Sequence, residues 1–491
     1  RSQVLFLLPE IALTPQLAAR VRARIPRTAV WHSGFTDGER AELWAAVARG
    51  EHDLVLGTRS ALFAPLPAPG LIIVDEEHET SYRQENTPRY HARDLAVVYG
   101  RQLAAPVVLG SATPSCESVF NARPTDGSAP RLKVLPLRAR PRGGQLPVPT
   151  VVDMRQEYQS QGKRAELSAV LVERLRATVA KREQAIVLLN RRGWSPVVTC
   201  TVCGVTAQCA SCDISLTFHR GAGLLKCHYC GHEKPMPSAC PACGGKLSTT
   251  GLGTEQLEQL VRQAVPGCRT LRADADTVGG RQGHAKLLQS FAAGEVDVLV
   301  GTQMVAKGLD FPRVTLVGVV CADRALAAPD FRAAERTYQL IAQVAGRAGR
   351  GERPGTVVVQ AFDPEAPAVS CAVHNKPRTF YDAELALRAE YGYPPGAGLV
   401  RILWTGAQEE QVRAAAEGQA QTLFDAATPL GCVVLGPTPA AIAWLKGQHR
   451  WHALIKAPSR GVAQQWLDQV LPLKRAAGVT AVVDVDPLTT A

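Results

Sequence analysis

The strongest constraint on the fold is an alternation of short apolar runs with amphipathic segments. Within residues 1–115 the runs "VLFLLP", "HDLVLGTRS", "LIIVDEEH" and "APVVLGSATP" end in polar turns, and helix-like segments separate them. Strands that are apolar on both faces are typical of parallel sheets covered by helices on both sides. We therefore expect an α/β fold with more than one core, because 491 residues exceed what a single core supports.

A later stretch of the chain repeats the first. "ARGEHDLVLGTRSALF" (48–63) aligns without a gap with "AAGEVDVLVGTQMVAK" (292–307), an offset of 244 residues. The same offset places "LIIV" (71–74) on "TLVG" and "WHSG" (31–34) on "ADTV". This register predicts two similar α/β lobes. Chance similarity between amphipathic strand–helix units is the alternative.

Composition shifts divide the chain into regions. We expect a first lobe over 1–140, a linker rich in Pro, Gly and Arg over 141–165, a second lobe over 166–365, a cysteine-rich insertion over 198–247 within it, and a C-terminal α+β domain over 366–491.

Charge and hydropathy narrow the partners and the compartment. The net charge of +11 favours acidic partners, nucleic acid first, although a solvated basic surface would give the same number. No apolar run reaches the roughly 18–20 residues that a membrane span needs, so we expect no membrane partner. Of the thirteen cysteines, the five outside the insertion are scattered singly. Scattered single cysteines suit the reducing cytoplasm.

Eight cysteines form four C-x₂-C pairs inside the insertion. In a reducing compartment this spacing indicates metal binding, and eight thiolates suffice for two tetrahedral, structural zinc ions. An iron–sulfur cluster is the alternative. The spacing does not fix which pairs share an ion; a nested arrangement, with inner pairs closing a hairpin and outer pairs clamping its base, is one solution. The predicted ligands are Cys200, Cys203, Cys209, Cys212, Cys227, Cys230, Cys240 and Cys243.

A run of acidic residues follows the buried strand "LIIV". Asp75 and Glu76 stand where nucleotide-hydrolysing enzymes carry a carboxylate for Mg²⁺ and a second carboxylate that orients the attacking water. Capping of the next helix by these acids is the alternative. "QVAGRAGRG" (343–351) adds two arginines three residues apart among small neighbours, and their guanidiniums suit phosphate oxygens. Together these stretches favour a nucleotide site.

Taken in order, the motifs resemble those of superfamily 2 DNA helicases, and most closely the bacterial primosomal replication-restart helicases, the PriA (primosomal protein N′) family. The resemblance covers nearly the whole chain and implies two RecA-like, P-loop-type lobes with parallel sheets, a two-zinc cysteine-rich insertion within the second lobe, and a C-terminal α+β domain. The matching stretches are "PEIALTPQ" (9–16), "GTRSALFAP" (57–65), "DEEH" (75–78), "SYRQENTPRYHARD" (81–94), "GSATPS" (110–115), "LNRRGW" (189–194), the eight-cysteine insertion, "GTE" (253–255), "RADADT" (272–277), "VGTQMVAKGLDFPRVTLVGVVCAD" (300–323) and "PDFRAAERTYQLIAQVAGRAGR" (329–350).

The resemblance also implies residue roles. The catalytic set would be Asp75, Glu76, Gln343, Arg347 and Arg350, and Asp310 would join Asp75, Glu76 and the two arginines in binding ATP and Mg²⁺. Residues coupling nucleotide state to DNA would be His78, Ser111 and Thr113. Candidate DNA contacts, several of them in an aromatic-rich loop, are Thr14, Arg59, Tyr82, Arg83, Gln84, Tyr90, Arg93, Arg191, Thr254 and Thr302.

The function that the resemblance implies is an ATP-dependent 3′→5′ DNA helicase of the primosome. Such a protein recognises stalled or abandoned replication forks and promotes replication restart in the cytoplasm. The implied partners are DNA forks, single-stranded DNA, primosome proteins and single-strand-binding protein. The zinc module would help to separate strands, and the C-terminal domain would add DNA and protein contacts.

The sequence departs from the family in one motif. No G-x-x-x-x-G-K-[ST] loop occurs in the 491 residues, and in the family this loop lies upstream of the strand that "QVLFLLPE" would match. Since its amides and Lys cradle the β- and γ-phosphates, we expect this chain alone to hydrolyse ATP poorly. The chain is either a fragment of an intact helicase, which the intact "DEEH" and "QVAGRAGR" favour, or a degenerate, non-catalytic scaffold that binds DNA and primosome proteins. A zinc-ribbon redox or RNA-processing protein would have no use for paired lobes.

Overall fold

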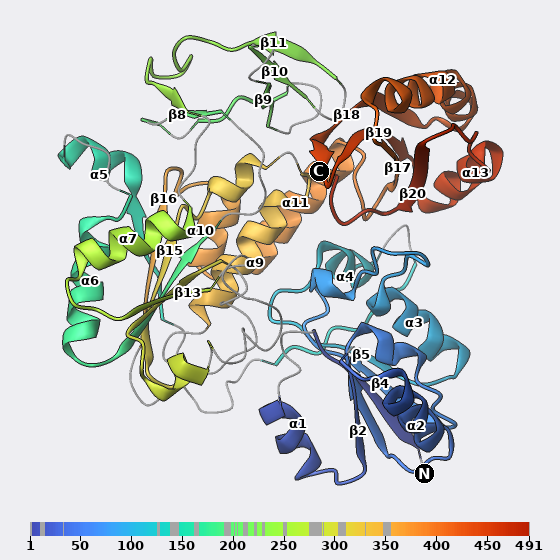
Figure 1. Cartoon of the computed structure of the whole chain (residues 1–491), viewed down its shortest axis with the longest axis horizontal. Coiled ribbons are helices and arrows are strands. Elements are labelled where there is room, and N and C mark those ends of the chain that lie inside the picture. The colour runs from blue at the N-terminus through green and yellow to red at the C-terminus, as the bar shows by residue number, and fades with distance from the viewer. Residues whose placement is uncertain are drawn as a thin grey trace. The chain divides into compact units, whose positions relative to one another are not determined.

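The first apolar runs form a parallel sheet of five strands in the order β2-β3-β1-β4-β5 (Figure 1). All of its neighbouring strands run parallel, as the apolar runs predict. Its core contains Leu5, Val55 and Ile72, all fully buried. The elements are β1 (Gln3–Leu7), α1 (Pro15–Arg22), β2 (Thr28–Trp31), α2 (Asp37–Ala48), β3 (Leu54–Gly57), β4 (Pro69–Val74), α3 (Ala92–Gln102), β5 (Val107–Leu109) and α4 (Cys116–Asn121), with short 3₁₀ turns at Arg59–Phe63 and Thr80–Tyr82.

The computed structural model divides into two units, one ending at Val119 and the other beginning at Phe120, and each is described by itself. The structure describes residues 2–9, 15–32, 34–124, 128–137, 147–161, 166–190, 198–200, 202–203, 205–209, 215–219, 223–227, 231–248, 253–273, 287, 289–302, 311–328, 330–346 and 355–490.

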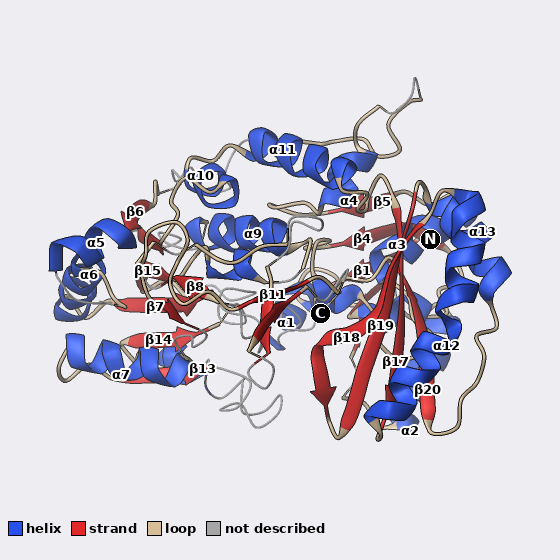
Figure 2. Cartoon of the chain, turned by 90° about the horizontal axis from the view of Figure 1, so that it is seen from above, coloured by secondary structure: helices blue, strands red, loops and turns tan. Residues whose placement is uncertain are grey.

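The second unit contains a second parallel sheet, of six strands in the order β13-β14-β7-β15-β16-β6. Every residue of its two central strands, β7 and β15, is buried, because helices cover both faces (Figures 1 and 2). The elements are β6 (Thr150–Asp153), α5 (Met154–Gln161), α6 (Ala169–Ala180), β7 (Gln184–Leu189), α7 (Thr254–Ala264), β13 (Thr270–Ala273), β14 (Val298–Gly301), β15 (Val314–Val320), α9 (Ala333–Ala345) and β16 (Thr356–Ala361).

The internal repeat of the sequence is a repeat of topology. Taken in chain order, β7, β13, β14, β15 and β16 are arranged as β1, β2, β3, β4 and β5 are in the first sheet. Strand β14 begins 244 residues after β3, which is the offset of the aligned sequences. The two predicted α/β lobes are thus confirmed. Residues 275–278, which the same offset aligned with 31–34, lie outside the described residues.

The predicted linker over 141–165 contains regular structure. Residues 150–153 form β6, which pairs in parallel with β16 and extends the second sheet at its edge, and α5 follows directly. Residues "TVVD" form a strand because they pair with β16, about 200 residues further along the chain. The neighbouring residues are rich in Pro, Gly and Arg, so the local sequence predicts a linker and not a strand.

Two smaller sheets form the cysteine-rich module, and an antiparallel sheet forms the C-terminal domain. In the module, β9 (Thr217–His219), β10 (Leu224–Lys226) and β11 (Glu233–Pro235) form one sheet, and β8 (Thr199–Cys200) pairs with β12 (Leu247–Ser248). The C-terminal sheet has the order β18-β19-β17-β20, and α12 and α13 pack against it (Figure 1). Its elements are β17 (Gly398–Gly406), α12 (Glu409–Ala427), β18 (Val433–Leu445), β19 (Gln448–Ala457), α13 (Arg460–Val470) and β20 (Val479–Val485).

The helices that precede the C-terminal sheet pack on the second lobe. Helix α10 (Pro367–Val373) packs against α9, and α11 (Pro377–Glu390) packs against α10. Tyr338 of α9 stacks on Phe380 of α11 with ring centroids 4.1 Å apart and an interplanar angle of 4°. Arg388 of α11 forms a buried ion pair with Glu335 of α9 at 2.9 Å. The predicted α+β domain is present, and its first helices are joined to the second lobe.

Candidate nucleotide and metal sites

The predicted catalytic acids stand at the carboxyl end of β4, between β1 and β5. The amide of Asp75 donates to the Leu7 carbonyl at 3.0 Å, so the chain continues the sheet for one residue before it turns. Glu76 then adopts a positive φ of 47°, a left-handed conformation that a residue with a side chain rarely takes. Its amide donates to Asp75 Oδ1 at 3.0 Å. The turn therefore holds both carboxylates at the edge where α/β sheets bind ligands.

The surroundings of Asp75 suit a cation. Burial raises the pKa of Asp75 above its ordinary value, and the Glu76 amide and the His78 charge offset this only in part. A side chain at Gly110 would begin 3.2 Å from Asp75 Oδ1, so glycine leaves this carboxylate its space. A hard divalent cation with oxygen ligands would favour the ionised form that burial disfavours. The donor set fits Mg²⁺ in this respect.

Tyr82 lies beneath the acidic turn. It is 1% exposed, and its hydroxyl donates to the carbonyl of Asp75 at 2.6 Å and to that of Leu7 at 3.1 Å. Burial and the neighbouring carboxylates raise the pKa of Tyr82, which keeps the phenol a donor. A ring enclosed in this way cannot stack on a base. We therefore remove Tyr82 from the predicted DNA contacts and assign it the positioning of Asp75.

Arg93 is also internal. It is 7% exposed, and its guanidinium donates to Glu77 at 3.1 Å, to Ser115 at 2.7 Å and to Asp94 at 2.8 Å. Burial opposes its charge, but Asp94 and Glu77 outweigh that effect and hold the pKa of Arg93 above its ordinary value. Since the guanidinium is committed to these partners, Arg93 is removed from the predicted DNA contacts. Instead it ties α3 to the acidic turn and to Ser115.

We expect Arg93→Ala to destabilise the first lobe by about 3–5 kcal/mol, because it removes one partner of a buried ion pair and leaves the buried carboxyl of Glu77 without its cation. Chemical denaturation followed by circular dichroism measures this change. Arg101→Ala on the same helix is the matched control: Arg101 is exposed, and its loss is expected to cost within about 0.5 kcal/mol. Equal effects of the two substitutions would contradict the assigned role.

The predicted coupling residues meet beside the acids. His78 Nδ1 and Ser111 Oγ are 2.8 Å apart, and the amide of Thr113 donates to the same hydroxyl at 3.0 Å. His78 Nδ1 also lies 3.7 Å from a carboxylate oxygen of Glu76. The acidic turn is thus joined through one imidazole to the "GSATPS" segment that follows β5.

The aromatic-rich segment forms a small hairpin. Arg83 and His91 make an antiparallel bridge, and the amide of Gln84 donates to the Tyr90 carbonyl at 2.8 Å. Arg59 donates to the carbonyls of Ser81 and Arg83, which holds the base of the hairpin. The Tyr90 ring meets that of Phe63 edge-on at 5.1 Å, and Phe63 is 51% exposed. Residues 85–88 at the tip are exposed.

The remaining predicted residues belong to the second unit or lie outside the described residues. Thr254 begins α7, Thr302 follows β14, and Gln343 is half-buried in the last turn of α9. Two zinc ligands and five nucleotide or DNA candidates lie outside the described residues: Cys212, Cys230, Thr14, Arg191, Asp310, Arg347 and Arg350.

The outer two cysteine pairs converge on one point. The sulfurs of Cys200, Cys203, Cys240 and Cys243 all lie within 4.8 Å of one another. Cys200 and Cys243 are 3.5 Å apart, and Cys203 and Cys240 are 3.6 Å apart. Sulfurs around a tetrahedral zinc with Zn–S of about 2.3 Å lie about 3.8 Å apart. The four thiols fit zinc, and this set is the outer half of the nested arrangement.

The turn at Cys227 has the backbone of a metal-binding knuckle. The amide of Cys240 donates to the Gly245 carbonyl at 2.9 Å, and the amide of Gly244 to the Cys240 carbonyl at 2.8 Å. Cys227 repeats the pattern with His232 and Gly231, at 2.8 and 2.9 Å. Gly231 and Gly244 share a positive φ, of 76° and 71°. The described residues at the two ends of this inner segment thus repeat the backbone hydrogen bonds of the outer knuckle.

Sequence reasoning missed the third acid of "DEEH" as a structural residue. Glu77 is 1% exposed, and it accepts from the amide and hydroxyl of Ser115 as well as from Arg93. Its partners are 16 and 38 residues away, so no local pattern signalled them. Asp323 was missed for the same reason: its carboxylate accepts the amides of Phe362 and Asp363 across the second sheet, and burial raises its pKa.

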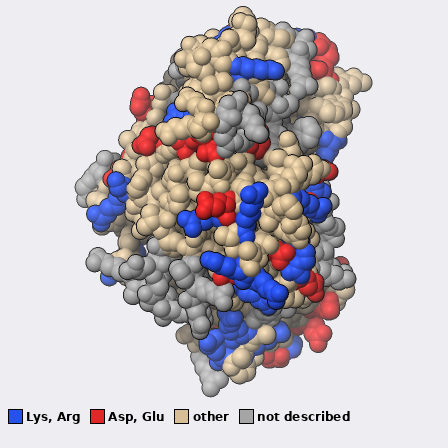
Figure 3. Space-filling model, turned by 90° about the vertical axis from the view of Figure 1, so that its left-hand side faces the viewer, with Lys and Arg blue, Asp and Glu red and all other residues tan. Residues whose placement is uncertain are grey.

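Not every face of the molecule carries an excess of basic side chains. On the side drawn in Figure 3, basic and acidic side chains are interspersed. Within the described residues, no helix is both long and apolar enough to cross a bilayer.

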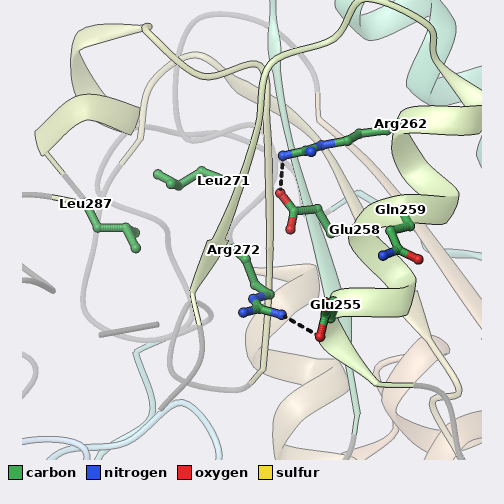
Figure 4. Close-up of a pocket in the computed structure, with 7 residues that line it drawn as sticks. All are labelled: Glu255, Glu258, Gln259, Arg262, Leu271, Arg272 and Leu287. Carbon is green, nitrogen blue, oxygen red and sulfur yellow. Dashed lines mark hydrogen bonds and ion pairs between the residues drawn. The ribbon is translucent and has the colours of Figure 1, made fainter. Parts of the chain in front are cut away.

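A charged pocket of about 380 Å³ opens on the second lobe between α7 and β13 (Figure 4). Arg262 pairs with Glu258 at 2.8 Å and Arg272 with Glu255 at 3.5 Å, so the charges at this pocket compensate one another. We assign it no ligand. Its lining residues are Glu255, Glu258, Gln259, Arg262, Leu271, Arg272 and Leu287.

Four family models match the chain in the order of its lobes and modules. They are the DEAD/DEAH box helicase over residues 1–122, the PriA DNA helicase Cys-rich region domain over 209–235, the helicase conserved C-terminal domain over 252–352, and the primosomal protein N C-terminal domain over 389–488.

Curated relatives match along almost the whole chain. Replication restart protein PriA of Bacillus subtilis is 44% identical over 92% of this chain and 56% of its own length. The Synechocystis protein of the same name is 41% identical over 99% of this chain and 59% of its own. The chain thus spans somewhat more than half the length of these two relatives. Replication restart protein PriA of Treponema pallidum is 42% identical over 99% of this chain and 72% of its own length. On this evidence the chain belongs to the PriA family of replication restart proteins.

Proposed function

We propose that this chain carries most of an ATP-dependent DNA helicase that moves 3′→5′, recognises stalled or abandoned replication forks and promotes replication restart. The observation that carries the proposal is the acidic turn after β4. There Asp75 and Glu76 stand at the carboxyl end of a parallel strand in the middle of the sheet, and Tyr82 donates to the Asp75 carbonyl from below. Family membership supports the same reading. We infer a cytoplasmic location from the scattered single cysteines.

In this proposal Asp75 would hold Mg²⁺, and Glu76 would orient the water that attacks the γ-phosphate. When bound, Mg²⁺ would neutralise charge on the phosphates. His78 lies within reach of both Glu76 and Ser111, at 3.7 and 2.8 Å, so a movement of the acids reaches the segment holding Thr113. From the second lobe, Asp310, Gln343, Arg347 and Arg350 would complete the site for ATP.

The cysteine module would hold two structural zinc ions. The outer site consists of Cys200, Cys203, Cys240 and Cys243. The knuckle at Cys227 supports an inner site, for which the sequence supplies Cys209, Cys212 and Cys230 as the other ligands. Because protein thiolates fill every coordination position, both ions would stabilise the fold and take no part in hydrolysis.

We propose that the aromatic hairpin and loops at the sheet edges bind forked and single-stranded DNA. Arg59, Arg83, Gln84 and Tyr90 remain candidates in the first lobe, beside Thr14. Thr254, Thr302 and Arg191 are candidates in the second. Single-strand-binding protein and other primosome proteins are proposed partners by family resemblance.

We expect Tyr90→Ala to weaken binding of single-stranded DNA by about 5- to 150-fold, the range that loss of one stacked base gives. Fluorescence anisotropy with a labelled oligonucleotide at fixed salt measures the change. Trp44→Ala serves as control, since Trp44 is an exposed aromatic ring of the same lobe but lies on α2, whereas Tyr90 is half-buried in the hairpin. If Tyr90→Ala binds DNA as the unaltered chain does, the hairpin is not a stacking platform.

The second candidate is a non-catalytic scaffold that binds DNA and primosome proteins. The aromatic hairpin and the cysteine module would serve such a scaffold as well as a helicase. ATP hydrolysis with and without DNA separates the two, on this chain and on the product of the reading frame from which it comes. Hydrolysis by that product supports the helicase. DNA binding without hydrolysis by either supports the scaffold.

A further inference from the structure

The cysteine-rich module and the C-terminal domain share one apolar core. This core contains Cys209 and Cys227, which are 2% and 0% exposed, together with Leu216 and Leu225 of the module. The module also contributes Val198, and the C-terminal domain contributes Tyr393, Leu399 and Leu454. Two of the four inner cysteines are thus enclosed with side chains of another domain.

The C-terminal strands supply this core with one of their two faces. On β19, Leu454 belongs to the core shared with the cysteine module, whereas the next residue, Ile455, belongs to the core beneath α12 and α13. On β17, Leu399 and Val400 divide in the same way. All four side chains are fully buried. The sheet therefore separates two cores, and the predicted zinc ligands Cys209 and Cys227 lie in the one that Leu399 and Leu454 share.

The knuckle itself lies against the C-terminal sheet. A side chain added at Gly231 would begin 3.9 Å from the hydroxyl of Thr438 on β18. Tyr393 lies at the same junction: Lys456 Nζ is 3.7 Å from its ring centroid, and its ring stacks on that of Phe331, with centroids 4.9 Å apart and an interplanar angle of 4°. Lys456 also donates to the Tyr391 carbonyl at 2.7 Å. The wall facing the cysteines is thus rigidly held.

We propose that the C-terminal sheet is the outer wall of the inner zinc site, so that the ion there is retained only while this sheet is packed on the module. The outer site, formed wholly within the module, would not depend on that packing. The physical reason is that side chains surrounding metal ligands fix the ligand geometry and exclude water and competing ligands, and their loss typically costs 10- to 100-fold in metal affinity. This inference rests on the proposed pair of zinc ions.

Zinc release from the 491-residue chain tests the inference. The zinc-loaded protein is mixed with a colorimetric zinc chelator in excess, and the absorbance records each ion as it leaves. We expect Leu454→Ala to speed the loss of one of the two ions by about 10-fold or more. Ile455→Ala is the matched control, because it removes similar volume from the neighbouring position but opens the other core. It should leave both release rates unchanged.

Leu454→Met is the control for misfolding, since this substitution preserves the side-chain volume and costs little folding free energy. It should restore slow release, and circular dichroism should report the same secondary structure for all variants. Equal acceleration by Leu454→Ala and Ile455→Ala would overturn the inference, as would no acceleration by either. If the unaltered chain holds two ions and Leu454→Ala changes the release rate of neither, only the inference about the C-terminal sheet is contradicted. A wild-type zinc content of one contradicts the two-ion proposal itself.

Discussion

Glu76→Gln is expected to lower DNA-stimulated ATP hydrolysis by about 100-fold or more, since a positioned carboxylate acting on the reacting groups typically contributes 10²–10⁴-fold. The amide keeps the shape of the side chain but cannot accept a proton or hold the water as a carboxylate does. The substitution leaves the backbone unchanged: the positive φ at residue 76 and the hydrogen bond from its amide to Asp75 Oδ1 remain. The turn should therefore keep its geometry. Phosphate release from the product of the complete reading frame, with and without single-stranded DNA, measures the effect.

Glu42→Gln is the control for this substitution, because Glu42 is an exposed carboxylate on α2 in the same lobe. ATP binding by Glu76→Gln, measured with a fluorescent ATP analogue, should remain close to that of the unaltered protein. A Glu76→Gln protein that hydrolyses ATP at the normal rate would show that the acid after Asp75 is not the residue that orients water.

Cys240→Ser is expected to reduce the zinc content from two ions to one and to unfold the outer knuckle. A structural zinc site in a small module contributes about 10–16 kcal/mol of apparent binding free energy, which becomes folding free energy. The Cys240 sulfur lies 3.6 Å from that of Cys203, and a hydroxyl in its place does not complete a thiolate tetrahedron. Metal analysis of the purified protein gives the stoichiometry, and proteolysis of the module reports its unfolding.

Cys268→Ser provides the comparison for this substitution. Cys268 is a half-buried thiol next to α7 and outside the four-cysteine cluster, so its loss should leave the metal content unchanged. Full zinc content in Cys240→Ser would contradict the outer site. Iron in place of zinc, with the visible absorption of an iron–sulfur cluster, would establish the alternative that the cysteine spacing leaves open.

The two lobes could be predicted from the sequence because buried parallel strands are apolar on both faces. "VLVG" at 298–301 and "LVLG" at 54–57 read as strands in isolation, and the shared register indicated a shared topology. The four C-x₂-C pairs predicted metal knuckles because ligand spacing within a turn is local. The carboxyl end of β4 could be located for the same reason, since strand and acids are adjacent in the chain.

Residues whose role depends on a distant partner could not be predicted. Arg93 and Tyr82 lie in a segment whose composition suits DNA contacts, yet the structure turns both side chains inward, to Glu77 and to the Asp75 carbonyl. Nothing within a few residues of either signals that partner. Strand β6 escaped prediction because the strand with which it pairs, β16, is about 200 residues away.

The contact between the cysteine module and the C-terminal domain could not be predicted either, because it also joins residues that are far apart in the chain. Leu454 and Ile455 are adjacent aliphatic residues in a strand, and alternation predicts only that they face opposite sides. Which side meets the cysteine module depends on how separate domains pack. Local pattern thus predicts elements and ligand turns, whereas the tertiary structure decides which side chains are enclosed.

Strand separation tests the central claim most directly. The product of the complete reading frame, loaded with zinc, is mixed with a forked duplex whose single-stranded arm has either 3′ or 5′ polarity, and unwinding is followed by release of a labelled strand. The account predicts ATP- and Mg²⁺-dependent unwinding from the 3′ arm, abolished by Glu76→Gln, and little or none by the printed chain alone. DNA binding without ATP-dependent unwinding by the complete product would contradict the account and leave a scaffold in its place.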